Sequence, residues 1–132
     1  MDIIDESPPP EGYLTIQLPA SSRDTNIFGD VNGGWLSAQM VLAAETRAAQ
    51  IAKGRIATVS IGTMEFVSPV LVGTLLSFYT EVVETGNSSI RIKVDVWGQC
   101  SDGREFRKIS ETETVQVAID LNGHIRALPE NC

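Results

Sequence analysis

The residues best suited to chemistry lie in a polar, glycine-rich loop and at the start of the helix that follows it. The loop spans residues 21–34 and reads SSRDTNIFGDVNGG, and a long helical pattern begins directly after it. Free backbone N–H groups and the positive end of the helix dipole meet at such a helix start, where they can hold an anion or polarise a carbonyl group. An equally good interpretation is structural: Asn32 caps the helix and the glycines only shape the turn.

The chain has few of the residues that other catalytic chemistries require. Its only imidazole is His124, which is best interpreted as an exposed turn residue, so a catalytic triad or a histidine-based dehydratase lacks an obvious base. Cys100 and Cys132 have no metal-ligand spacing, and a zinc site needs more Cys or His than the chain carries. The chain contains neither the GxxxxGK[ST] motif of phosphate-binding loops nor a GxGxxG motif that opens a helix after a strand. The sequence therefore predicts no metal site and does not favour a nucleotide-binding enzyme.

The charge balance argues against two further classes of partner. The 132 residues include 17 acidic and 10 basic side chains, and the net charge of −7 disfavours binding to nucleic acid or to an anionic membrane surface. No stretch approaches the roughly 18 consecutive apolar residues of a membrane span. Residues 1–12 lack the basic start and apolar stretch of a signal peptide, and we expect a cytoplasmic protein with reduced cysteines.

The chain divides by composition at residue 12. Residues 1–12 contain four acidic residues, no basic residue and the run Pro8-Pro9-Pro10, which predicts a loosely attached, acidic, proline-rich arm. With 42% apolar and 20% charged residues, the chain as a whole has the composition of a globular protein. We therefore expect one folded domain over residues 13–132.

One long helix and several strands are predicted within this domain. Residues 35–53 contain no glycine or proline and carry apolar side chains around much of the circumference, so we expect a helix that other elements surround. Strand patterns occupy residues 13–18, 56–66, 75–83 and 89–97 and the stretch after the Asp102-Gly103 turn. A sheet curled around one central helix satisfies this order, which makes the predicted fold α+β.

Three segments make the sequence similar to a known family. DTNIFGDVNGGWLSAQM at 24–40, GRIATVSIGTMEFVSPVLVG at 54–73 and VAIDLNGHIRALP at 117–129 resemble the YciA-type acyl-CoA thioesterases of the hotdog-fold superfamily. The resemblance implies a central helix wrapped by a curved antiparallel sheet of five or six strands. It also implies dimers with a continuous sheet, usually assembled as trimers of dimers, an acyl-CoA substrate and no cofactor apart from the coenzyme A of that substrate.

The resemblance implies a mechanism as well. Backbone N–H groups of Gly33, Gly34 and Trp35 would stabilise the oxyanion that develops on the thioester carbonyl. Asn26, in the DTN motif, would orient the water or the carbonyl. Lys108 matches a family lysine and would meet the phosphates of coenzyme A, the alternative being a solvated strand residue. The residues assigned to substrate binding are Asn32, Gly33, Val41 and Lys108.

The sequence departs from the family pattern at one position. Family members carry a catalytic acid seven residues after the second glycine of the GG pair, and here that position is Val41. The nearest helix acid is Glu45, one turn further along, which is either a relocated acid or a polar residue at the helix edge. Ser37 would lack a base, and Asp30 is better explained as shaping the turn. Three explanations stay open: a relocated acid, a weak enzyme, or a protein that binds acyl-CoA without hydrolysing it.

Overall fold

The computed structural model describes residues 12–67, 69–100, 103 and 106–130. The predicted arm lies outside these residues apart from Gly12, as does Asp102 of the predicted turn. The described residues form one long helix and one five-stranded sheet. The elements are β1 (Tyr13–Pro19), η1 (Ser22–Asp24), α1 (Gly33–Ala52), β2 (Ile56–Ile61), β3 (Leu75–Thr85), β4 (Ser89–Gln99) and β5 (Phe106–Ala118).

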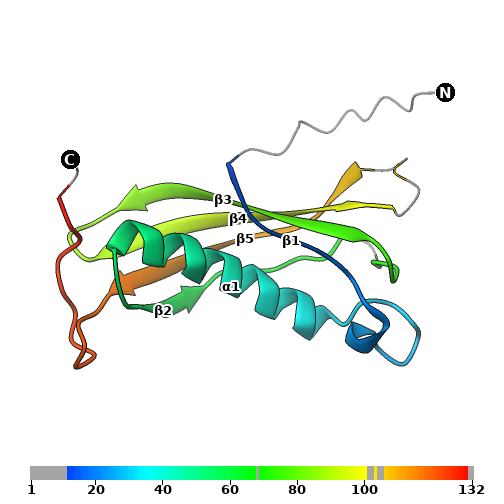
Figure 1. The fold of residues 1–132 in the computed structure, drawn as a ribbon, viewed down its shortest axis with the longest axis horizontal. Helices are drawn as coiled ribbons and strands as arrows, with labels where there is room; N and C mark the ends of the chain where they lie inside the picture. The colour runs from blue at the N-terminus through cyan, green and yellow to red at the C-terminus, as the bar shows by residue number, and fades with distance from the viewer. Residues whose placement is uncertain (1–11, 68, 101–102, 104–105, 131–132) are drawn as a thin grey trace.

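The sheet is antiparallel with the order β1-β3-β4-β5-β2, and α1 lies across one of its faces (Figure 1). The prediction of a strand over 56–66 is wrong at its C-terminal end, because β2 stops at Ile61. Beyond that residue the chain still follows β5, but only isolated bonds join them. Gly62 N–H donates to Glu113 O at 2.8 Å, and the Glu65 carbonyl accepts from the Ser110 hydroxyl at 2.8 Å. A regular ladder needs consecutive backbone pairs, which this segment does not make.

The helix begins two residues earlier than predicted and ends one residue earlier. Asn32 takes the N-cap position, so both glycines of the GG pair belong to the first turn of α1. At the other end Lys53 adopts a left-handed conformation, with φ of 54°, and its N–H donates to Ala49 O. Within the part of the chain that the structure describes, no helix combines the length and the apolar character that a membrane crossing needs.

One face of α1 packs on the sheet. The buried helix residues, most of them small, are Leu36, Met40, Ala43, Ala44, Ala48 and Ala52. Small side chains let the helix lie close to the strands. Within a single chain, however, the helix is covered on one side and not surrounded as predicted: Leu42 is 47% exposed, and Val41 is half-buried. The apolar pattern around the helix is thus wider than the surface that one sheet covers.

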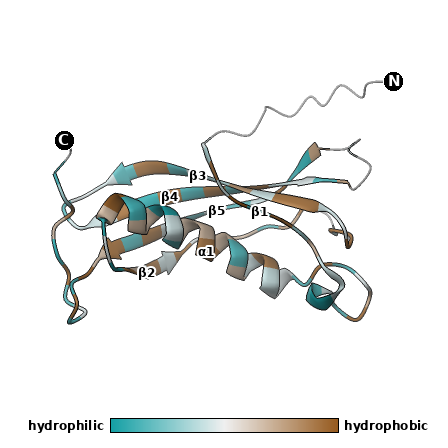
Figure 2. Ribbon diagram, viewed as in Figure 1, coloured by the Kyte–Doolittle hydropathy of each residue, from teal (hydrophilic) through white to brown (hydrophobic). Residues whose placement is uncertain are grey.

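The alternation predicted for β4 is confirmed. Ile90, Ile92 and Val94 are fully buried on the inner face of the sheet, while Arg91 is exposed and Lys93 is half-buried on the outer face. Hydrophobic and hydrophilic segments accordingly alternate along the strands (Figure 2). The inner side chains of β3 and β4 form the core together with the buried face of α1.

Arg126 links the chain after β5 to the end of α1. Its guanidinium donates to Ile119 O at 2.9 Å and to Ala52 O, at the end of α1, at 2.8 Å. Gly54 leaves room for this group, since a Cβ at that position would lie 2.9 Å from Arg126 Nη2. Arg126 therefore satisfies a carbonyl at the helix C-terminus, where a cation is favoured.

We predict that Arg126→Met lowers the free energy of unfolding by about 2 kcal/mol, because two carbonyl groups lose a charged donor. Urea unfolding followed by circular dichroism measures the effect. The matched control is Arg23→Met in the exposed η1 turn, which should change stability by less than about 0.5 kcal/mol. Equal effects of the two variants would contradict a structural role for Arg126.

Candidate active site

The loop before α1 is organised by Asn26. Its side-chain Oδ1 accepts hydrogen bonds from Phe28 N–H at 2.8 Å and from Asp30 N–H at 3.2 Å, and its backbone N–H donates to Asp30 O at 2.7 Å. This Asx-type arrangement places the loop tip in solvent, where Phe28 is 79% exposed. The Asn26 carbonyl oxygen is therefore used inside the loop, and its side-chain NH2 group donates to no atom among the described residues. Asp30 shapes the turn, as its simpler interpretation predicted.

At the start of α1, the predicted oxyanion donors are not equivalent. Asn32 Oδ1 accepts from Gly34 N–H at 2.7 Å and from Trp35 N–H at 3.2 Å, so the helix cap uses two of the three amides. Gly33 N–H has no acceptor among the residues that the structure describes. Gly33 is also exposed. Of the three predicted donors, it is the one that a ligand carbonyl can meet without displacing the cap.

An apolar hollow of about 310 Å³ opens beside Gly33. Its lining consists of Val31, Gly33, Leu36, Phe66, Val67, Pro69 and Val70. The ring of Phe66 stands next to the helix start, with Cε2 4.0 Å from the position that a Cβ on Gly33 would take. Among the described residues that line it, none has a charged side chain or a polar side-chain atom. A backbone donor beside an apolar hollow can polarise the carbonyl of a ligand whose apolar part enters the hollow.

Glu45 lies further along the helix and contacts the sheet. Its Oε2 atom is 2.7 Å from the hydroxyl of Thr58 on β2, and the same hydroxyl is 2.8 Å from Oε1 of Gln116 on β5. Twelve residues separate Glu45 from Gly33, which is about 18 Å along a helix axis. Val41 lies about 12 Å along the axis from Gly33 and places no titratable group there. The structure therefore does not bring Glu45 together with the helix start of its own chain.

Sequence reasoning missed the polar contacts of Glu45 on the sheet. The inner face of β5 carries a polar series, fully or almost fully buried, that consists of Ser110, Thr112, Thr114 and Gln116. Gln116 donates to Thr114 Oγ1 at 3.0 Å, and its Oε1 atom lies 2.8 Å from the Thr58 hydroxyl. The single hydrogen of that hydroxyl can be donated either to Gln116 or to Glu45, which places Glu45 at the end of this series. Alternation of these residues with the outward Glu111 and Glu113 was the signal in the sequence that could have identified them.

Lys108 is held by carboxylates on the outer face of the sheet, away from the helix. Its Nζ lies 3.2 Å from Glu111 Oε1 and 3.6 Å from Asp95 Oδ1. Burial raises the pKa of the Asp95 carboxyl above its usual range, although Lys108 and Lys93 oppose that rise. A hydrogen bond from Lys108 lowers the pKa of Glu111. A phosphate at Lys108 would have to compete with two carboxylates for the same ammonium group.

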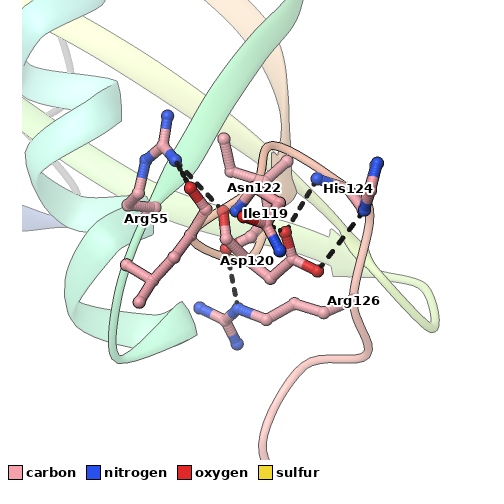
Figure 3. A network of polar contacts seen from close by, with 7 residues as sticks. Arg55, Ile119, Asp120, Asn122, His124 and Arg126 are labelled. Carbon is pink, nitrogen blue, oxygen red and sulfur yellow. Dashed lines mark hydrogen bonds and ion pairs between the residues drawn. The ribbon is translucent and has the colours of Figure 1, made fainter.

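The remaining expectations concern metals and His124. No cluster of metal-ligating side chains occurs among the described residues. The side chain of His124 is 79% exposed, and its Nδ1 lies 3.9 Å from Asp120 Oδ2 in the turn after β5 (Figure 3). This agrees with its interpretation as a turn residue.

Comparison with known proteins decides the family. The family model described as the thioesterase superfamily matches residues 28–101. The acyl-CoA thioester hydrolase YciA of Escherichia coli K12 is 38% identical over 124 residues, which cover 91% of this chain and 93% of the relative. The chain belongs to the thioesterase superfamily. The resemblance to its YciA-type members is confirmed.

Solved structures of superfamily members support the fold prediction. The hexameric thioesterase y2039 from Yersinia pestis superposes with a TM-score of 0.88 at 38% identity, covering 92% of this chain and 99% of that chain. Cj0915 of Campylobacter jejuni, described as a hexameric hotdog fold thioesterase, superposes with a TM-score of 0.83 at 28% identity, covering 89% and 91% of the two chains. The predicted α+β hotdog fold is confirmed, with five strands.

We predict that Asn32→Ala lowers the free energy of unfolding by about 1 kcal/mol, because the Gly34 and Trp35 amides lose their acceptor. Asn32→Asp, which keeps a capping oxygen, should stay close to the wild type. Urea unfolding of the three proteins measures the difference. An Asn32→Ala protein as stable as the wild type would show that the cap contributes nothing.

The carboxylates around Lys108 predict opposite pH dependences of stability. Because the pKa of Asp95 is raised, the folded state binds the proton of this carboxyl more tightly than the unfolded state does. The contribution of Asp95 to the free energy of unfolding therefore falls as the pH rises through the pKa of this carboxyl. Asp95→Asn should therefore gain stability relative to wild type between about pH 3 and pH 7. For Glu111 the pKa is lowered, so its stabilisation is lost as pH falls and Glu111→Gln should show the reverse trend. Urea unfolding at several pH values tests both, and parallel trends would contradict the assignment.

Proposed function

We propose that the protein hydrolyses the thioester bond of acyl-CoA, releasing free coenzyme A and a carboxylic acid. The observation that carries this proposal is the unpaired Gly33 N–H at the helix start, beside an apolar hollow. Membership of the thioesterase superfamily and the likeness to YciA support the reaction type. Coenzyme A enters as part of the substrate, and the proposal needs no further cofactor.

In the proposed reaction, the thioester carbonyl oxygen accepts a hydrogen bond from Gly33 N–H. A water molecule attacks the carbonyl carbon, and the negative charge that develops on the oxygen is stabilised by this amide and by the positive end of the helix dipole. The carbon–sulfur bond then breaks, and the proton taken from water passes to the sulfur of coenzyme A. The side-chain NH2 group of Asn26, which the loop leaves unused, orients the water or the carbonyl.

A general base completes the reaction, and we propose Glu45 of a second subunit for this role. Within one chain Glu45 is about 18 Å along the helix from Gly33, which is too far for proton transfer. An acid that serves this carbonyl from α1 therefore has to come from another copy of the chain. Because Glu45 lies one turn beyond the family position at Val41, we expect slow hydrolysis: a displacement of about 1 Å can already cost a hundredfold in rate.

The proposal therefore includes self-association as a dimer, assembled further as a trimer of dimers. The relatives y2039 and Cj0915 are described as hexameric. Strand β2 is at an edge of the sheet, where Val59 and Ile61 are 57% and 51% exposed. An edge strand with exposed apolar side chains is suited to pairing with a second copy.

A second candidate function is acyl-CoA binding without hydrolysis in a regulatory oligomer. Two observations favour it: Val41 stands at the family acid position, and the Glu45 carboxylate is hydrogen-bonded to Thr58 of its own chain. In that case the helix start and the apolar hollow would hold the substrate, and no group would activate water.

Free coenzyme A released from butyryl-CoA distinguishes the two functions. We predict that the wild type hydrolyses the substrate slowly, that Glu45→Gln lowers kcat at least tenfold, and that Val41→Asp raises kcat at least tenfold by restoring the family acid. The matched control is Glu84→Gln, an exposed carboxylate at the far end of β3, which should behave like the wild type.

Each outcome has a defined meaning. Undiminished activity in Glu45→Gln would remove Glu45 from the mechanism while leaving hydrolysis in place. Tight binding of acyl-CoA without any release of coenzyme A, in the wild type and in Glu45→Gln alike, would overturn the hydrolase proposal in favour of the binding function. Sedimentation analysis of the same samples measures the oligomer.

A further inference from the structure

We propose that Thr58 and Gln116 are positioning residues of the proposed reaction, which hold the Glu45 carboxylate in place through one of its two oxygens and leave the other free to take a proton from water. The inference rests on the proposed function, because it takes Glu45 as the general base. It adds the residues that fix this base to the sheet, and it gives the contact between Glu45 and its own chain a use in catalysis.

One carboxylate oxygen of Glu45 is anchored and the other is open to water. Oε2 lies 2.7 Å from the Thr58 hydroxyl, which comes from strand β2. Oε1 has no hydrogen-bond partner among the described residues, and it is not one of the buried polar atoms that lack a partner in that part of the chain. A side chain that is fixed through one oxygen keeps the second oxygen in a defined place, where it can accept a proton. The contact with Thr58 is therefore compatible with catalysis.

The anchor continues into the interior of the protein along the inner face of β5. The Thr58 hydroxyl also lies 2.8 Å from Oε1 of Gln116, and Nε2 of Gln116 lies 3.0 Å from Thr114 Oγ1. Gln116 and Thr114 are fully buried. These distances are those of good hydrogen bonds, and buried polar groups that are paired in this way hold a single arrangement. Glu45 is thus fixed to the interior of its own subunit.

The series of hydrogen bonds ends on the carboxylate of Glu45. The Thr58 hydroxyl carries one hydrogen, for which Glu45 and Gln116 compete. An ionised carboxylate is a stronger acceptor than an amide oxygen, so the hydrogen goes to Glu45. Gln116 then presents its NH2 group to Thr58, which needs only a turn of the amide by about 180°. The amide oxygen faces the Thr114 hydroxyl in that orientation, and each hydrogen bond of the series points towards Glu45.

A fixed carboxylate is important here because Glu45 stands one helix turn beyond the family position at Val41. A glutamate side chain has several rotatable bonds and samples several rotamers when no partner selects one of them. A displacement of about 1 Å from the productive position can cost about a hundredfold in rate. The contact with Thr58 selects one rotamer before the substrate binds, so that the carboxylate spends less time in unproductive positions.

The test measures kcat and KM for butyryl-CoA in Thr58→Val, which keeps the shape of the side chain and removes its hydroxyl. We expect kcat to fall about tenfold and KM to stay within about twofold of the wild type, because the lost contact moves the base and not the groups at the helix start. Thr58→Ser, which restores a hydroxyl, should recover most of kcat. Gln116→Met, which removes the second contact of the Thr58 hydroxyl, should lower kcat with KM unchanged.

The matched control is Thr46→Val, next to Glu45 on α1. The Thr46 hydroxyl donates to Leu42 O at 2.8 Å and does not contact Glu45, so this variant should keep the wild-type kcat. Sedimentation analysis and circular dichroism of each variant exclude a loss of assembly or of folded structure as the cause of a change.

A double variant separates a positioning role from a purely structural one. The base is absent in Glu45→Gln, so the addition of Thr58→Val should cause no further loss of kcat. A further loss of about tenfold would overturn the inference, because Thr58 would then act independently of Glu45. A wild-type kcat in Thr58→Val, with Glu45→Gln impaired, would overturn the inference alone. Equal kcat in the wild type and in Glu45→Gln would instead remove Glu45 from the proposed mechanism, and this inference with it.

Discussion

The close contact between one face of α1 and the inner face of the sheet determines where every candidate site residue lies. Met40, Ala43, Ala44 and Ala48 are fully buried there, opposite strands whose inner side chains are also fully buried. A close-packed interface of this kind does not slide or rotate without opening voids. The rotation of the helix is thereby set, and with it the positions of Gly33 at the mouth of the hollow and of Glu45 beside β2.

The backbone N–H groups at the helix start could serve two purposes, helix stability and binding of a ligand carbonyl. The first-turn amides need acceptors for stability, and a thioester carbonyl needs donors for catalysis. Asn32 meets the first demand with one side-chain oxygen that takes the Gly34 and Trp35 amides. The Gly33 N–H, one residue earlier, has no acceptor among the described residues and is the donor in the proposed reaction. The same cap that stabilises the helix therefore narrows three predicted donors to one.

The Glu45 carboxylate and the Gly33 N–H, which the proposed reaction combines, lie far apart along α1 of one chain. Val41 and Glu45 are about 12 and 18 Å along the helix from Gly33, so no acid at either position can act on a carbonyl held by the same chain. The proposed site therefore requires a second copy of the chain. The wide apolar pattern of α1 is consistent with this, since Leu42 remains exposed when a single sheet covers the helix.

The sequence alone determined the helix, the strand order along the chain, the alternation in β4 and the cap at Asn32, because each depends on neighbours a few residues apart. It also pointed to the family and to the departure at Val41. The tertiary structure decided what depends on segments far apart in the chain. Strand β2 ends at Ile61, and Phe66 lies beside Gly33. Glu45 accepts a hydrogen bond from Thr58, and Lys108 forms an ion pair with Asp95. The reason is that local periodicity specifies which face of an element is apolar, whereas the partner that each polar side chain meets depends on the register and distance between elements.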